Sequence, residues 1–164
     1  MVIEINYDRE GDVDYIQDLK EQVCKLIKNT FDDAVVYLTN PESIPAFGSG
    51  GTFCVEPIAS SMFTSAGKDE ACHSITLNIW TYANGDDESA EKELTVIAGR
   101  LECVLYYAGK RFPGDDIPGL RFYETEHLHT DYRKREIGRA FRRRRIWAAC
   151  TFWRVQVILN DANN

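Results

Sequence analysis

The spacing of apolar residues changes from a period of two to a helical period in the middle of the chain. In His73–Tyr82, the apolar side chains of Ile75, Leu77 and Ile79 alternate with other residues, which is typical of a strand with one buried face. An Ala-Asn-Gly break follows, and apolar residues then recur at steps of three and four over Ser89–Ala108. A strand followed by an amphipathic helix that packs back on the sheet favours an α+β domain.

The same criteria predict one further helix and four further strands. The helix carries an apolar stripe from Ile16 to Ile27, ends near Asn29 and can be capped by Asp12 or Asp14. The further strands are predicted at residues 34–38, 52–58, 120–129 and 146–159. The intervening segments are predicted as loops at 39–51, 59–71 and 110–119 and as a basic connector at 130–145.

We therefore expect residues 1–164 to form a single α+β domain. Its core would be a mostly antiparallel sheet of about five strands, with two main helices packed on one face. The last predicted strand, 146–159, is apolar on both faces: Trp147 and Trp153 lie on one, and Ile146 and Cys150 on the other. Such a strand is central in its sheet, or one of its faces meets a partner.

Composition limits the cellular compartments in which we expect this domain to function. The chain is 44% hydrophobic, yet no run approaches the roughly 20 apolar residues of a membrane helix. The opening residues, MVIEINYDREGDVD, lack a signal-peptide pattern, so we expect the cytoplasm or a particle assembled there. The five cysteines are odd in number and widely spaced, which favours buried free thiols over a disulfide framework.

Charge is distributed unevenly along the chain. Residues 133–145 carry eight of the 19 basic residues and one acidic residue, a net charge of +7. The remainder has eleven basic and 25 acidic residues, a net charge of −14. An acidic body with one basic segment predicts a complementary partner, which includes another copy of the same chain.

The histidines offer a weak candidate metal site. His127 and His129 are two residues apart on a predicted strand, so both rings are expected on one face, with Cys72 or Glu126 as further ligands. The third histidine, His73, belongs to another strand, and no second spaced pair of ligands is present. The pattern therefore favours an ordinary polar surface over a metal centre.

A second candidate is a set of carboxylates typical of metal-dependent nucleases. This hypothesis places a divalent metal among Asp116, Glu124, Glu126 and His127. Such sites usually have a lysine two residues after a strand glutamate, and Leu128 stands there instead. The set is weaker than the alternative of a solvated surface, but a metal-dependent nucleic-acid-processing enzyme remains the competing class.

Other signatures of catalysis or cofactor binding are absent from the sequence. None of GxSxG, HExxH, GxxxxGK[ST] or GxGxxG occurs. The glycine-rich segment 48–51 is not followed by a predicted helix, so it lacks the helix N-terminus of a phosphate cradle and is interpreted as a flexible loop. We therefore expect no catalytic residue, no cofactor and no metal.

The basic segment allows two interpretations. Its Lys and Arg residues, interleaved with Tyr132, Phe141 and Trp147, could grip phosphates. Alternatively, the segment is a charged connector that meets acidic patches on a neighbouring subunit. The acidic body would be repelled by DNA, which favours the protein contact and leaves a local contact with DNA passing through a ring as the other possibility.

The order of elements resembles that of the tail terminator, or tail completion, proteins of long-tailed bacteriophages. The resemblance covers about the whole chain as a layout. It is carried by the opening helix, the AVVYL strand, the Gly/Pro loop, the strand ITLNIWTYANG, the helix ending LECVLYY and the closing strand IWAACTFWRVQVIL. The segment between the last two strands is richer in arginine than the family pattern.

The resemblance implies a structural virion protein and not an enzyme. Such proteins form a ring, commonly a hexamer, at the head-proximal end of the finished tail tube in the viral tail or neck. The ring ends tube polymerisation and forms the interface for head–tail joining. The implied partners are further copies of the chain, the tail tube protein and a head–tail connector or neck protein. DNA would only pass through the lumen, no membrane would be involved, and virus assembly would take place in the host cytoplasm.

We expect the protein interface to centre on the arginines and on two tryptophans of the last strand. The predicted interface residues are Arg139, Arg142, Arg143, Arg144, Arg145, Trp147 and Trp153. A different neck or connector protein of the same particle is the alternative within this class.

Overall fold

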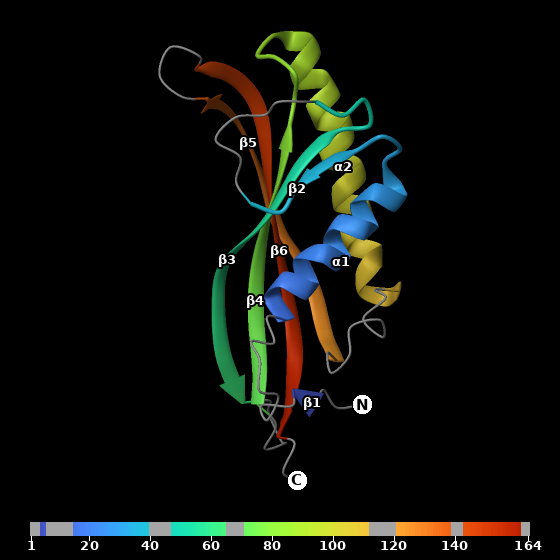
Figure 1. The fold of residues 1–164 in the computed structure, drawn as a ribbon, viewed down its shortest axis with the longest axis vertical. Coiled ribbons are helices and arrows are strands. Elements are labelled where there is room, and N and C mark those ends of the chain that lie inside the picture. The colour runs from blue at the N-terminus through green and yellow to red at the C-terminus, as the bar shows by residue number, and fades with distance from the viewer. Residues whose placement is uncertain are drawn as a thin grey trace.

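The computed structural model describes residues 4–5, 15–39, 47–64, 71–111, 121–138 and 143–161 (Figure 1). The helices are α1 (Tyr15–Thr30) and α2 (Glu88–Arg111). The strands are β1 (Glu4–Ile5), β2 (Val35–Tyr37), β3 (Thr52–Thr64), β4 (Ala71–Tyr82), β5 (Arg121–Ile137) and β6 (Arg144–Asp161).

These strands form one mixed sheet. Its order is β1-β6-β4-β3-β2, and β5 also pairs with β6. The pairs β3–β4, β4–β6 and β5–β6 are antiparallel, whereas β1–β6 and β2–β3 are parallel. The predicted fold class is confirmed: two helices accompany a mostly antiparallel sheet of five main strands, and β1 adds a strand of two residues.

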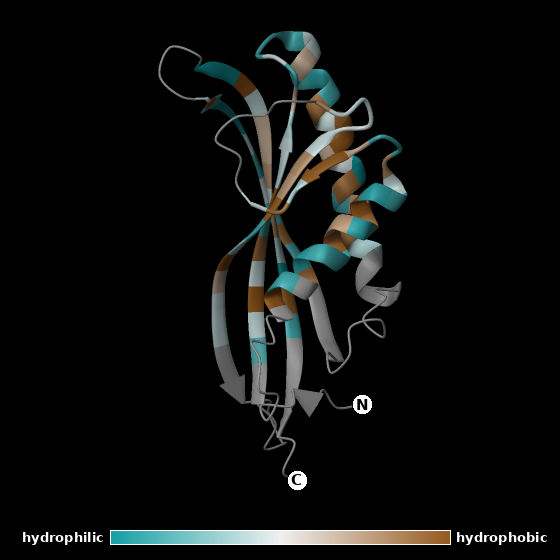
Figure 2. Cartoon of the chain, in the orientation of Figure 1, coloured by the Kyte–Doolittle hydropathy of each residue, from teal (hydrophilic) through white to brown (hydrophobic). Residues whose placement is uncertain are grey.

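Both helices cover the same face of the sheet, which we call the helix face. Their apolar stripes meet the alternate strand residues that point to that side, and Figure 2 shows hydrophobic positions recurring along both helices and strands. The buried cluster includes Leu19, Val23, Ile27, Leu101, Leu105, Ile75, Leu77, Ile79, Trp153 and Val155. This burial confirms the helical stripes and the strand alternation predicted from the sequence.

The opposite face, which we call the open face, carries its own apolar cluster. It is formed by Cys54, Trp80, Tyr82, Ile146, Ala148 and Cys150. Residues of β6 alternate between the two clusters, as Trp153 and Cys150 do. The prediction that β6 is apolar on both faces is therefore confirmed.

The start of α2 is fixed to β6. The Asp87 carboxylate (Oδ1) accepts a hydrogen bond from the backbone N–H of Ala90 at 2.8 Å, which is an N-cap. Just before it, the Ala83 N–H donates to the Trp147 carbonyl at 2.9 Å, and the Trp147 N–H donates to the Gly85 carbonyl at 2.8 Å. These bonds hold the acidic start of α2 at the same end of the sheet as the start of β6.

The strands extend further than the sequence predicted. Strand β3 continues to Thr64 and β4 begins at Ala71, so residues 59–64 and 71 of the predicted loop 59–71 are paired strand, whereas residues 65–70 lie outside the described residues. Likewise, β5 runs to Ile137, so much of the predicted connector 130–145 is strand. The physical reason is cross-strand pairing, which overrides the local preference of small and charged residues for loops.

The predicted loop 39–51 is described only in part. Residues 40–46 lie outside the described residues, as do 112–119 of the predicted loop 110–119. Gly48–Gly51 form a turn, in which the Gly51 N–H donates to the Gly48 carbonyl at 3.1 Å. A Cβ atom on Gly50 would lie 1.7 Å from the Asp32 carbonyl oxygen, so only glycine allows this turn to press against the connection from α1 to β2.

Candidate functional site

The basic segment forms one end of the β5–β6 pair. We call residues 133–137 and 143–147 the basic hairpin. Its register pairs Lys134 with Trp147 and Glu136 with Arg145. In Figure 1 this part of the two strands extends away from both helices, at the upper left of the view. Because strand side chains alternate, the hairpin presents basic groups on both of its faces.

On the open face, two arginines of β5 lie against aromatic rings. The Arg135 guanidinium lies 4.3 Å from the centroid of the Trp80 ring, and its Nη1 donates to the Tyr82 hydroxyl at 3.4 Å. The Arg133 guanidinium lies 5.7 Å from the same ring. Trp80 Nε1 in turn donates to the Glu56 carboxylate at 2.8 Å. These contacts orient the arginines and cover the apolar cluster of the open face.

A third open-face arginine is held at the start of β6. Arg144 Nη2 donates to the Asn84 side-chain oxygen at 2.5 Å, and its guanidinium lies 5.4 Å from the centroid of the Phe47 ring. Both contacts come from segments that lead into or out of the sheet. Arg144 therefore ties the hairpin to the body of the domain.

The other face of the hairpin has looser contacts. Lys134 Nζ lies 5.2 Å from the Trp147 ring, and Arg143 Nη1 lies 3.8 Å from the Glu136 carboxylate. Arg143 and Arg145 are both exposed. An exposed ion pair at this distance contributes little to stability, about 0–1 kcal/mol, so it does not fix the side chain strongly. This face is the part of the hairpin that is available to a neighbouring molecule.

An acidic surface lies near the hairpin, on the side of the helices. We call it the acidic helix start, and it consists of the exposed residues Asp86, Asp87, Glu88, Glu91 and Glu93. Lys92 is the only basic residue between positions 86 and 93, and its amine lies 2.9 Å from the Glu88 carboxylate. One end of the molecule therefore carries two surfaces of opposite charge, and Arg145 shares the helix face of β6 with Trp147, beside the start of α2.

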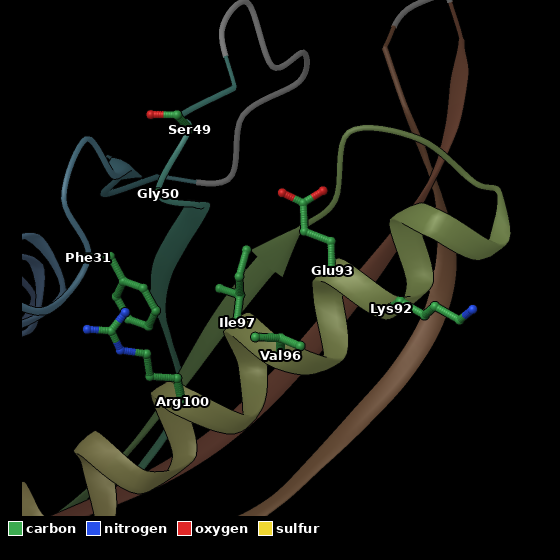
Figure 3. A pocket seen from close by; sticks show the side chains of 8 residues that line it. All are labelled: Phe31, Ser49, Gly50, Lys92, Glu93, Val96, Ile97 and Arg100. Atoms are coloured by element: carbon green, nitrogen blue, oxygen red, sulfur yellow. The ribbon is translucent and has the colours of Figure 1, made fainter.

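A pocket of about 470 Å³ opens between the end of α1, the glycine turn and α2 (Figure 3). Phe31, Val96 and Ile97 give it an apolar lining. Arg100 lies at one end, where its guanidinium donates to the Thr30 carbonyl at 2.8 Å and lies 5.0 Å from the Phe31 ring. Val96 is 71% exposed at the rim of this pocket.

The predicted arrangement of the histidines is wrong. A register shift between His127 and His129 pairs them with Trp153 and Phe152, which are neighbours on opposite faces of β6. This β-bulge places the two rings on different sides of the sheet. His127 Nε2 lies 3.0 Å from the Thr130 hydroxyl, whereas His129 stacks on Phe152 at 4.3 Å between ring centroids.

The remaining candidate ligands do not converge either. His73 is buried on β4, and burial lowers its pKa. The carboxylate of Glu126 forms an ion pair with Arg154, on the face opposite His127. Asp116 and the side chain of Glu124 lie outside the described residues. Among the residues that the structure does describe, no three His, Cys, Asp or Glu side chains are grouped to hold a metal ion.

Two buried thiols belong to the open-face cluster. Burial raises the pKa of Cys54 to about 12, and burial likewise raises the pKa of Cys150 to about 11. The Cys150 thiol donates to the Asn78 side-chain oxygen at 2.6 Å. Both groups therefore stay protonated near neutral pH and lack the thiolate that a nucleophile needs. The structure records Cys24, Cys54, Cys103 and Cys150 as free thiols, but only Cys54 and Cys150 are buried as predicted, whereas Cys24 is half-buried and Cys103 is exposed.

The predicted interface residues fall into three groups. Arg143, Arg144 and Arg145 are exposed on the hairpin, and Trp147 is partly buried beneath Lys134. Trp153 is fully buried in the helix-face core, so its place in the predicted interface is wrong: it stabilises this chain and offers no surface to a neighbour. Arg139 and Arg142 lie outside the described residues.

Sequence reasoning missed the pocket and the arginine–tryptophan stack. Arg133 and Arg135 are two residues apart, which would have placed both on one strand face had the segment been recognised as a strand. The pocket had no comparable signal, because it depends on how the glycine turn packs against the end of α1.

No protein-family model matches the chain, and no curated protein matches its sequence. Within the described ranges, no helix combines the length and apolar character needed to cross a membrane.

Proposed function

We propose that this protein is a tail terminator of a long-tailed bacteriophage. In this proposal, copies of the chain form a ring at the head-proximal end of the tail tube, end tube polymerisation and provide the interface to the head or neck. The ring would bind its own copies, the tail tube protein and a head–tail connector, and DNA would only pass through it. The protein would act in the virion, with no reaction centre of its own.

One observation carries this proposal: an exposed basic hairpin and an exposed acidic helix start lie at the same end of the domain. Two copies placed side by side in the same orientation would bring the hairpin of one against the acidic surface of the other. Such a contact is heterologous, and heterologous contacts close into rings when the rotation between copies allows it. A single-sign surface would instead keep the copies apart.

The direct test uses tail tubes assembled from purified tail tube protein. Adding this chain should stop tube growth and leave a ring at one end of each tube in electron micrographs. The variant Arg143→Glu/Arg145→Glu should leave the tubes growing, because it reverses the exposed charge of the hairpin. The matched control is Lys25→Glu/Lys28→Glu, which reverses two exposed charges on α1. Tubes that grow equally in the presence and absence of the wild-type protein would contradict the proposal.

The same test separates the two structural alternatives. A different neck or connector protein would bind the head portal and leave tube ends uncapped. The enzyme class is tested by incubating DNA and RNA with the protein and Mg²⁺ or Mn²⁺. We expect no cleavage, and cutting that is lost in Glu126→Ala would replace the structural proposal with an enzymatic one.

A further inference from the structure

We propose that Asn84 is a self-modifying residue, at which the side-chain amide is converted to a carboxylate, and that Arg144 assists this reaction. The inference goes beyond the proposed ring and does not depend on it, because it concerns the chemistry of a single chain. It starts from the turn between β4 and α2, at the top of Figure 1, where Asn84 is followed by Gly85. This is the only Asn-Gly pair in the sequence.

The reaction uses the main-chain nitrogen of Gly85 as its nucleophile. This nitrogen attacks Cγ of Asn84 and forms a C–N bond, while the bond from Cγ to Nδ2 breaks and ammonia leaves with the proton of the Gly85 N–H. Water then opens the cyclic imide that results. Cleavage of the bond to Cγ gives aspartate, whereas cleavage of the bond to the main-chain carbonyl carbon gives isoaspartate. No oxidant or reductant is needed.

The turn leaves the nucleophile open to this reaction. The Gly85 carbonyl accepts the Trp147 N–H at 2.8 Å, but the Gly85 N–H has no hydrogen-bond partner among the described residues. Gly85 also lacks a side chain that would shield its nitrogen, and its φ of 146° is one that other residues rarely adopt. The fold therefore requires glycine at the position where glycine most favours attack on Asn84, which is itself exposed to water.

Arg144 is placed to assist the attack. Its Nη2 donates to Oδ1 of Asn84 at 2.5 Å, and its guanidinium lies 5.4 Å from the centroid of the Phe47 ring. A cationic donor on this oxygen draws electron density from Cγ and stabilises the negative charge that develops on Oδ1 during the attack. The bond engages the oxygen and not Nδ2, which is the nitrogen that leaves.

Two other asparagines of the described chain show why exposure alone is not enough. Asn29 is exposed, but it precedes Thr30 within α1, where the next main-chain N–H belongs to the helical hydrogen-bond ladder. Asn78 is only 7% exposed and lies in β4, which is paired on both sides. Asn29 is therefore the internal comparison for Asn84, because the two residues share exposure and differ in backbone structure.

The two products would act differently on the basic hairpin. Aspartate gives Arg144 a carboxylate in place of a neutral oxygen, so the hydrogen bond becomes an ion pair and is stronger. Isoaspartate lengthens the main chain by a methylene group between Ala83 and Gly85, both of which bond to the backbone of Trp147. It would therefore loosen the connection between the start of α2 and β6.

The test follows the folded full-length protein at pH 8 and 37 °C. Peptide mapping by mass spectrometry and chromatography separates the amide, aspartate and isoaspartate forms of each peptide. We expect conversion at Asn84 to be roughly tenfold faster than at Asn29 or more, because the nucleophile beside Asn29 is held in a helical hydrogen bond. Equal conversion at the two residues, or no conversion at Asn84, would overturn the inference.

A pair of variants isolates the part played by Arg144. Arg144→Gln removes the charge and should slow the conversion roughly tenfold, which is the effect of losing one charge-assisted hydrogen bond. Arg143→Gln is the matched control, because Arg143 lies near Glu136 instead, and it should leave the rate unchanged. In urea the difference between Arg144→Gln and the wild type should vanish, since the contact exists only in the folded chain. Conversion of folded Arg144→Gln at the wild-type rate would refute the assistance by Arg144.

Discussion

The two faces of the sheet bury similar apolar residues but are covered in different ways. On the helix face, Trp153 and its neighbours lie beneath α1 and α2. On the open face, Trp80 is only 7% exposed although no helix of the described chain packs there, and Arg133 and Arg135 lie across its ring. One face thus stabilises the fold through an ordinary core. The other uses charged side chains as its cover, which places positive charge on the surface.

Because of this difference, we expect substitutions on the two faces to lower the free energy of unfolding by different amounts. Trp153→Ala should have the largest effect, because it removes a large side chain that is fully buried in the helix-face core. We expect a loss of about 3–5 kcal/mol in the free energy of unfolding, measured by urea denaturation. Trp147→Ala is the matched control at a partly buried site of the same strand, and an equal loss there would contradict the comparison.

The open-face cluster should make the fold sensitive to alkaline pH. An exposed cysteine thiol has a pKa of 9.0, and burial raises the pKa of Cys54 to about 12 and that of Cys150 to about 11. Between the unfolded-state and folded-state pKa values, each thiol ionises in the unfolded chain but stays protonated in the folded protein. The free energy of unfolding therefore keeps its full value below the unfolded-state pKa and falls as the pH rises toward the folded-state pKa. The free energy of unfolding should therefore be roughly 3 kcal/mol lower at pH 10 than at pH 7.

Chemical denaturation at pH 7, 9 and 10 measures this loss. The double variant Cys54→Ala/Cys150→Ala should begin less stable at pH 7 because it leaves small cavities, yet its stability should change less between pH 9 and pH 10. An unchanged pH dependence in that variant would assign the alkaline loss to other groups.

Removing the arginine cover should cost less than removing the core. Arg135→Ala deletes the stack on Trp80 and the hydrogen bond to Tyr82, so we expect a loss of about 1–2 kcal/mol and a red-shifted tryptophan emission. Arg133→Ala, whose guanidinium is further from the ring, should cost less. If Arg133→Ala caused the larger loss of stability, the distances of the two guanidinium groups from the Trp80 ring would not predict the relative strengths of the two contacts.

The smallest effect on stability should come from the exposed arginines. Arg143→Glu/Arg145→Glu changes side chains that are exposed, with one long ion pair to Glu136, so the free energy of unfolding should stay within about 0.5 kcal/mol of the wild type. A thermal unfolding scan at neutral pH checks this. A large loss would mean that the hairpin serves the fold of its own chain and is not reserved for a neighbour.

Periodicity was enough to predict the elements and the faces of the central strands. Ile75, Leu77 and Ile79 alternate in sequence and are buried together, and the helix predicted to end near Asn29 ends at Thr30. The bulge between His127 and His129 could not be predicted, because it depends on pairing with β6 and not on the residues of β5 alone.

Of the candidate site, only the concentration of positive charge in residues 133–145 could be predicted from the sequence. The arginine-rich stretch is plain in the sequence, but its local composition favoured a connector, whereas pairing along β6 makes much of it strand. The pocket depends on Gly50 meeting the backbone at Asp32, a contact between segments on either side of β2. Such tertiary contacts leave no periodic signal in either segment.

The central claim is that this chain works by joining two oppositely charged surfaces of neighbouring copies. The most direct measurement compares the particle masses of the wild-type protein and Arg143→Glu/Arg145→Glu by native mass spectrometry at low salt. We predict a closed ring of uniform mass for the wild type and a folded monomer for the variant. Identical masses for the two proteins would contradict the claim.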